Sequence, residues 1–161
     1  MKRFITALLA LAMVFLCAGC VGSRDSLPGT LGVTLTDSAI SEHWDEHGWM
    51  GDGTEYWKVE LSPEDAAALE QTAQTGEGWH PLPANGDGEI LVFGRESFGF
   101  YLTGKDGKPL LPQVEEGYWF FWDDQTHSPE TDGVLGRGSY NFTAAVYDAK
   151  TRTLYCGELD T

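Results

Sequence analysis

Basic residues are scarce in this sequence. Its 161 residues include 25 Asp and Glu but only 10 Lys and Arg, which gives a formal net charge of -15 at pH 7. Proteins that bind nucleic acid need a positively charged surface for the phosphate backbone. The composition therefore argues against nucleic acid as a partner.

The chain is also short, and this limits its architecture. A length of 161 residues fits one ordinary domain and is too short for a TIM barrel or a two-domain enzyme. Hydrophobic residues make up 42% of the chain and aromatic residues 12%, which excludes a disordered chain. We therefore expect one folded domain with a sizeable core.

Long hydrophobic runs are missing as well. Residues 4–16 form an apolar run of 13 residues, interrupted only by Thr6, after the cationic start Lys2-Arg3. A bilayer-spanning helix needs about 20 apolar residues, whereas this length and these flanks are typical of a secretory signal peptide. We predict a signal peptide at residues 1–19.

The sequence LCAGC at residues 16–20 follows this run and resembles the bacterial lipobox. The resemblance implies that Cys20 receives a diacylglyceryl group and becomes the first residue after cleavage. Lipidation at Cys17 is less favoured, because bulky Phe15 and Leu16 precede it. An uncleaved anchor and an ordinary signal peptide cut at a different position are less favoured too. Two acyl chains, at about 0.8 kcal/mol per buried methylene, hold a protein on a membrane firmly.

Cleavage before Cys20 makes the remaining chain still more acidic. It removes two bases and no acids, so the formal charge changes from -15 to -17. Anionic lipid surfaces repel such a domain, so the lipid on Cys20 would have to supply the attachment. Residues 20–30 contain Gly, Ser and Pro and suit a flexible tether, which leaves residues 31–161 as the exported globular domain.

Cysteine is rare, with three residues in the whole chain. Once Cys20 carries lipid and the signal peptide is gone, only Cys156 remains, which excludes an intramolecular disulfide and a cysteine-based zinc site. Cys156 shares a predicted strand face with Leu154. We therefore expect a buried, unreactive thiol.

The hydrophobic pattern of the exported part is mostly of period two, which indicates antiparallel strands. Residues 148–151 (DAKT) between the last two candidates are a hairpin signal. The predicted strands are residues 54–61, 89–94, 98–103, 117–122, 140–147 and 152–159.

Two segments carry helix signals. Ser62 is a predicted N-cap, Pro63 suits the first helical position and Gly76 ends the helix. A second, shorter helix is predicted at residues 38–47, between Asp37 and Gly48. The predicted fold class is α+β: a single domain with a mainly antiparallel sheet and one or two helices on one face.

The densest polar cluster lies at residues 42–53. His43 and His47 are four residues apart and would share one face of a helix, where a carboxylate such as Asp52 could complete a divalent metal site. The string from His43 to His47 also spells the inverted zincin pattern, but glycine follows at once and no distant ligand can be nominated. We favour a core role, in which Ile40, His43, Trp44 and His47 form a buried helical stripe.

A second acidic cluster lies at residues 123–132. It lacks the positional pattern of an EF-hand loop, so a solvated loop is favoured over a calcium site. Paired carboxylates near Trp119 and Trp122 could indicate a sugar-cleaving site, but aromatic residues in a strand usually belong to the core. We therefore favour a core role for both tryptophans.

Two parts of the chain resemble a group of small uncharacterised bacterial proteins, some of them lipidated. These are residues 46–53 (EHGWMGDG) and the C-terminal part, residues 141–161, which contains NFTAAVYD and LYCGELDT. The group has a His-Gly-Gly-aromatic-His-Gly-Asp-Gly stretch and a Leu-Tyr-Tyr-x-Glu-Leu-Asp-Thr-like end. This chain has one glycine fewer and Met50 in place of the second histidine. The group has no established activity, so the resemblance implies no catalytic residue in this chain.

The sequence thus predicts a lipid-anchored protein on the outer side of the cytoplasmic membrane. The favoured role is a non-enzymatic domain that binds an envelope protein, a peptide or a small ligand. A metal-binding or metal-dependent hydrolase domain that uses His43, His47 and Asp52 is the second hypothesis. An accessory factor that acts by occupying a partner is the third.

Overall fold

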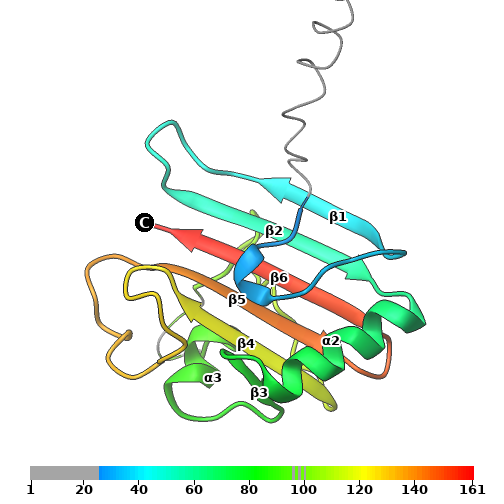
Figure 1. Ribbon diagram of the computed structural model, residues 1–161. Coiled ribbons are helices and arrows are strands. Elements are labelled where there is room, and N and C mark those ends of the chain that lie inside the picture. Colours follow the sequence, from blue (N-terminus) through cyan, green and yellow to red (C-terminus); the bar gives the residue numbers. More distant parts are fainter. Residues whose placement is uncertain (1–25, 96, 98, 100) are drawn as a thin grey trace, which may run out of the picture.

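One antiparallel sheet of six strands organises the computed structural model, which describes residues 26–95, 97, 99 and 101–161 (Figure 1). The spatial order of the strands is β1-β2-β6-β5-β4-β3. Their bounds are Ala39–Asp45 (β1), Gly53–Glu60 (β2), Trp79–Pro81 (β3), Gly117–Asp123 (β4), Asn141–Asp148 (β5) and Thr153–Asp160 (β6). The predicted signal peptide, Cys20 and the start of the tether lie outside the described residues.

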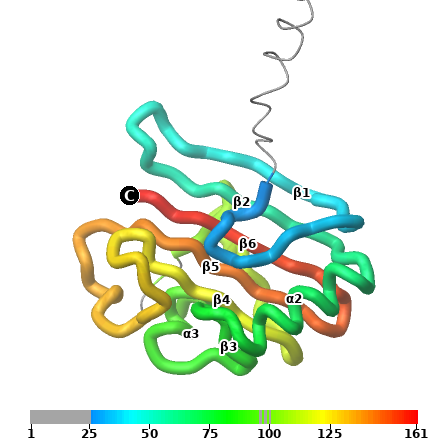
Figure 2. The backbone as a smooth tube through the Cα atoms, in the orientation of Figure 1, coloured from blue at the N-terminus to red at the C-terminus, as the bar shows by residue number. Residues whose placement is uncertain are grey.

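Each of the two helices covers one face of the sheet. Helix α2 (Pro63–Thr75) and the 3-10 turn η1 (Gly29–Leu31) pack on one face, here called the α2 face. The buried residues of this face include Trp57, Val59, Phe120, Ala145, Tyr147, Leu154 and Cys156. Residues 26–38 run over the same face beside α2 (Figure 2).

Helix α3 (Gly86–Phe93) packs on the opposite face, the α3 face. Alternation along each strand separates the two cores, because neighbours such as Trp119 and Phe120 point to opposite sides of the sheet. The predicted α+β class with a mainly antiparallel sheet is confirmed. The prediction placed one or two helices on one face. Helix α2 does cover one face of the sheet, and α3 covers the opposite face.

The expected elements are present where the local sequence signals are strongest. The Ser62 hydroxyl accepts a hydrogen bond from the Asp65 N–H at 3.0 Å, Pro63 is the first helical residue and Gly76 follows the last. In the β5–β6 hairpin, Asp148 Oδ1 accepts from the Lys150 N–H at 2.9 Å. The strands predicted at residues 54–61, 117–122, 140–147 and 152–159 are confirmed to within a few residues.

The helix predicted at residues 38–47 is wrong, because this segment forms β1 at the edge of the sheet. A shift in pairing register lies between Ile40 and Glu42. It puts Ile40, opposite Val59, on the same face as His43, opposite Trp57. A bulge of this kind inserts an extra residue and so imitates the three-residue spacing of a helix.

Two other predicted strands are wrong. Residues 89–94 fall largely in α3, where Ile90, Leu91, Val92 and Phe93 are all buried. A short run that is apolar on every side carries no period that separates helix from strand. No strand forms at residues 98–103 among those described there, which contribute two isolated bridges, Arg95 with Gly99 and Thr103 with Pro109.

Gly117 starts β4 at a point where only glycine fits. Its φ is +139°, and a Cβ atom placed there would lie 1.9 Å from the Tyr147 carbonyl oxygen. The absence of a side chain at Gly117 therefore lets the start of β4 pack closely against the end of β5.

Candidate functional site

The end of the α2 face beyond the helix carries a row of polar side chains. Cross-strand pairing aligns Asp45 of β1 with Glu55 of β2, Glu55 with Glu158 of β6, and Glu158 with Thr143 of β5. Residues directly opposite each other in antiparallel strands have Cβ atoms about 4.5–5.5 Å apart, and like charges in such positions are destabilising. The row therefore costs stability when its carboxylates are ionised without a positive charge beside them.

Thr143 joins the row to another carboxylate. It is a buried residue, and its hydroxyl lies 3.3 Å from Glu158 Oε1 and 3.3 Å from Asp124 Oδ2. A hydroxyl has one proton to donate, so it can serve only one of these oxygens at a time. Burial and then the charge of Glu55 raise the pKa of Glu158 to about 7. Burial also raises the pKa of Asp124, with the charge of Asp160 adding to it.

His43 holds Glu55 in place. The His43 Nε2 atom lies 2.8 Å from Glu55 Oε1, and each of these side chains is 18% exposed. The imidazole also stacks on the Trp57 indole, with ring centroids 5.3 Å apart and an interplanar angle of 17°. Pairing of β1 with β2 puts these residues side by side because His43 and Trp57 are cross-strand partners.

His47 bridges two carboxylates that are far apart in sequence. Its Nδ1 atom lies 2.7 Å from Asp45 Oδ1, and its Nε2 atom lies 3.1 Å from Asp160 Oδ2. Burial lowers the pKa of His47, but the hydrogen bond and charge of Asp45, helped by Asp160, outweigh it, so the pKa is raised overall. The His47 backbone N–H lowers the pKa of Asp45 most, followed by the His47 side chain.

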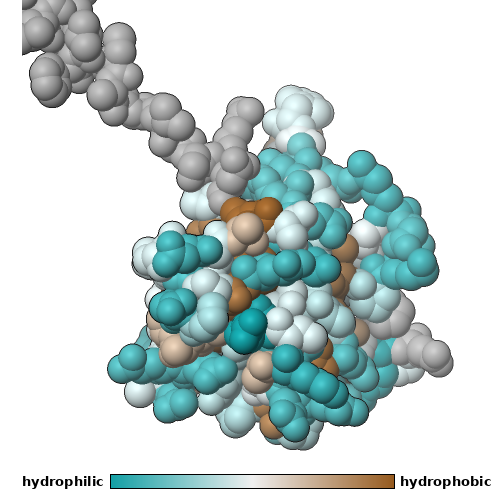
Figure 3. Space-filling model, turned by 90° about the vertical axis from the view of Figure 1, so that its right-hand side faces the viewer, coloured by the Kyte–Doolittle hydropathy of each residue, from teal (hydrophilic) through white to brown (hydrophobic). Residues whose placement is uncertain are grey.

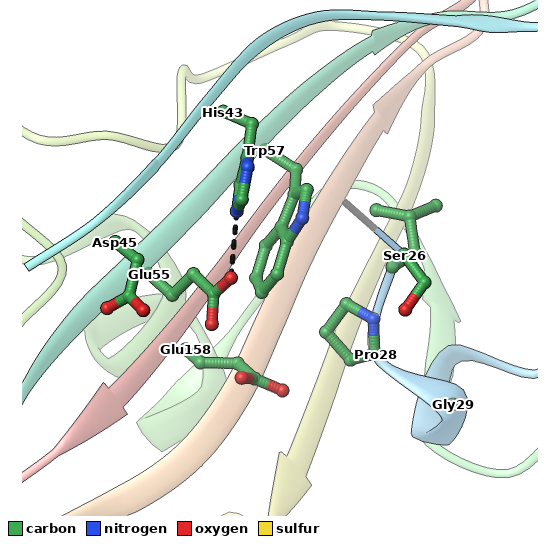
Figure 4. A pocket seen from close by; sticks show the side chains of 9 residues that line it. Ser26, Pro28, Gly29, His43, Asp45, Glu55, Trp57 and Glu158 are labelled. Atoms are coloured by element: carbon green, nitrogen blue, oxygen red, sulfur yellow. Dashed lines mark hydrogen bonds and ion pairs between the residues drawn. The ribbon is translucent and has the colours of Figure 1, made fainter. Parts of the chain in front are cut away.

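A cavity of about 710 Å³ opens over this row. Figure 4 shows His43, Asp45, Glu55 and Glu158 on one side of the cavity and the chain from Ser26 to Gly29 on the other. No Lys or Arg is among the described residues that line it. The cavity therefore has an excess of negative charge, which favours a cationic ligand.

Trp57 forms part of the wall of this cavity. The residue is 2% exposed, and its Nε1 atom has no hydrogen-bond partner within the described part of the chain. A buried N–H without an acceptor is uncommon in native proteins and requires an explanation such as a bound molecule. A ligand that carries an oxygen acceptor would satisfy it.

The predicted site residues are brought together only in part. His43 and His47 both reach the acidic row, His43 through Glu55 and His47 through Asp45. Asp52 does not join them and lies exposed in the β1–β2 loop, where its carbonyl accepts from the Gly48 N–H at 2.8 Å. The predicted helical stripe and the inverted zincin helix are both wrong, because the two histidines lie on a strand and in the loop that follows it.

The second acidic cluster is largely structural. Asp123 is 1% exposed and accepts hydrogen bonds from Arg137 Nη1 and Thr126 Oγ1, each at 2.7 Å. These bonds fold the loop after β4 back onto the sheet. Trp119 is buried on the α3 face, whereas Trp122 packs on the α2 face, where the Asp124 carboxylate meets the Thr143 hydroxyl. Both tryptophans thus contribute to the core, as expected from the sequence.

Most of the acidic row was not predicted from the sequence, although the strand patterns do place some of its acids on a buried face. Glu55 falls on the face of Trp57, and Glu158 and Asp160 fall on the face of Cys156, so both strands carry acids on the side that faces the α2 core. An acid at a buried strand position is uncommon unless it is paired or functional. The contribution of Asp160 could not be read from the sequence, because it lies 113 residues from His47.

Comparisons with known proteins add no function: no family model, no curated protein and no solved structure matches this chain. Within the described residues, no helix has both the length and the apolar character needed to cross a membrane. The surface in Figure 3 is mostly hydrophilic, with small separate hydrophobic areas. Trp49 and Met50 in the β1–β2 loop are large hydrophobic side chains that are exposed, at 95% and 73%.

Proposed function

We propose that this protein is a lipid-anchored, non-enzymatic binding domain on the outer side of the cytoplasmic membrane, and that it binds a cationic ligand in the cavity of the α2 face. The observation that carries the ligand class is the cross-strand row of Asp45, Glu55 and Glu158, with no Lys or Arg in the described cavity lining. A bound cation would relieve the repulsion within the row. The unsatisfied Trp57 N–H supports a ligand that also carries a hydrogen-bond acceptor.

The predicted anchor and the cavity are close in sequence. Ser26 lines the cavity and is six residues after Cys20. Six residues span at most about 20 Å when fully extended. An acylated Cys20 would thus keep the cavity near the membrane surface, while the negative charge of the domain would keep its body away from anionic lipid headgroups.

Metabolic labelling with palmitate tests the anchor. We expect the wild-type protein and the Cys17→Ala variant to incorporate the label and the Cys20→Ala variant to lose it. Cys17→Ala is the matched control because it removes a thiol three residues away. Unchanged labelling of Cys20→Ala would overturn the proposed location.

Calorimetric titration tests the ligand class with probes of opposite charge. We expect the full chain in detergent to bind the polyamine spermidine and not the dianion glutarate, with affinity that falls at least about tenfold in Glu55→Gln and Glu158→Gln. Glu60→Gln, which changes an exposed acid of the same strand β2, serves as the control. Equal binding of both probes, or no effect of the two cavity variants, would reject the acidic cavity as the binding site.

A further inference from the structure

We infer that the cation held at one end of this cavity is a divalent transition-metal ion, bound by Asp45, His47 and Glu55. This inference rests on the proposed cation-binding function and names the class of ligand. The three residues come from the end of β1, the loop that follows it, and β2. The β1–β2 hairpin therefore supplies the whole set.

The distances suit a single ion. One ligand atom from each of the three residues lies within 4.8 Å of the others. Ligand atoms around a tetrahedral zinc ion, with bonds of about 2.0–2.2 Å, are about 3.4 Å apart. The hydrogen bond of 2.7 Å between His47 Nδ1 and Asp45 Oδ1 would be replaced by bonds from both side chains to the ion.

A second layer of hydrogen bonds holds the ligand side chains. With His47 Nδ1 on the metal, Nε2 would carry the proton and donate it to Asp160, whose carboxylate is 3.1 Å away. A metal-bound histidine usually donates its other ring N–H to a carboxylate or a carbonyl in this way. His43 holds the Glu55 ligand from the other side, since its Nε2 lies 2.8 Å from Glu55 Oε1.

The donor set selects the class of metal. One imidazole nitrogen with two carboxylates suits zinc and its transition-metal neighbours, whereas calcium takes six to eight oxygen ligands. Asp45 and Glu55 also line the cavity, as does Trp57, so a ligand held in the cavity would complete the coordination of the ion. This is a ligand-binding arrangement and differs from the closed four-ligand sites that serve only structure.

Calorimetric titration of zinc into the full chain, after chelator treatment and dialysis, tests the inference. We expect one equivalent of zinc to bind, with calcium binding at least about a hundredfold more weakly. His47→Asn and Glu55→Gln should each weaken zinc binding by at least about tenfold. Asp160→Asn should weaken it by about 10–100-fold, the effect typical of an outer-layer partner.

Two variants outside the cavity control for general effects of charge and of histidine loss. Glu60→Gln and the exposed His127→Asn should bind zinc like the wild type, and thermal unfolding would establish that every variant is folded. Zinc binding below about a tenth of an equivalent, or binding that His47→Asn leaves unchanged, would overturn the metal site. So would equal affinity for calcium.

The spermidine titration distinguishes failure of the metal site from failure of the proposed function. If zinc does not bind but spermidine binding still depends on Glu55 and Glu158, the metal inference is wrong and the cationic-ligand proposal stands. If neither probe binds, both are rejected. The palmitate experiment decides the anchor independently of both.

Discussion

The Thr36 backbone N–H lies 3.1 Å from each carboxylate oxygen of Asp65. The Thr36 hydroxyl and the Asp37 N–H also donate to this carboxylate, at 2.7 and 3.0 Å. Asp65 is 2% exposed and belongs to the first turn of α2, so it ties the segment before β1 to the start of the helix. The same segment continues back to the wall of the cavity.

Asp65 should therefore stabilise the fold in a pH-dependent way. Hydrogen bonds from Ser38 and Thr36 hold the pKa of this carboxyl well below its usual range, although burial opposes them. A carboxyl with a lowered folded-state pKa contributes stability above its unfolded pKa of about 3.9, and this stability is lost as pH falls through the folded pKa. We expect Asp65→Asn to lower the free energy of unfolding by about 2–4 kcal/mol near neutral pH, and by less as the pH falls below about 3.

Urea denaturation across this pH range measures the effect. Glu64→Gln, an exposed acid one residue earlier in the same helix, is the control and should change little. A loss of stability for Asp65→Asn that is as large in acid as at neutral pH would show that the carboxylate charge is not responsible.

In the metal-free protein, ionisation of Glu158 should lower the stability of the fold, whereas ionisation of Asp65 raises it. Its folded-state pKa of about 7 lies above the unfolded value of about 4.3, so its contribution to stability is lost as pH rises through 7. Glu158→Gln should then be more stable than the wild type at about pH 8, by roughly 1–3 kcal/mol, and equal to it near pH 4. Thermal unfolding in the presence of chelator measures this, and a variant that is less stable than the wild type at about pH 8 would contradict it.

Gly117 should not tolerate a side chain. Because its φ of +139° and the Tyr147 carbonyl both exclude a Cβ atom, we expect Gly117→Ala to lower the free energy of unfolding by more than about 2 kcal/mol. Gly138→Ala is the matched control, since no atom lies within 4 Å of its added Cβ. Similar denaturation midpoints for the two variants would refute this interpretation of the β4–β5 junction.

The thiol of Cys156 should react only after unfolding. The side chain is fully buried, and burial raises its pKa well above the usual value, with the charges of Glu158 and Glu55 adding to it. This confirms the buried thiol expected from the strand pattern. We expect no labelling of Cys156 by a thiol reagent in the native mature chain and one equivalent in denaturant. Rapid labelling of the native protein would contradict the placement of this strand.

Much of the fold followed from local patterns in the sequence. The Ser62-Pro63 start of α2, the hairpin turn at residues 148–151 and the alternation in β2 each depend on contacts within a few residues. Such signals are readable because they do not require knowledge of the partner strand. The bulge in β1 and the buried apolar run Ile90 to Phe93 of helix α3 could not be predicted in this way, since neither has the period of its element.

Less of the candidate site could be predicted from the sequence. The sequence by itself determined an acidic composition, histidines spaced closely enough to share a site, and acids on the buried faces of two strands. Only the tertiary structure decided that Asp45, Glu55, Glu158 and Thr143 stand in one row, because strand pairing joins residues from opposite ends of the domain. Pairing register is a property of two strands together, and neither strand's sequence states which residue of the other it will face.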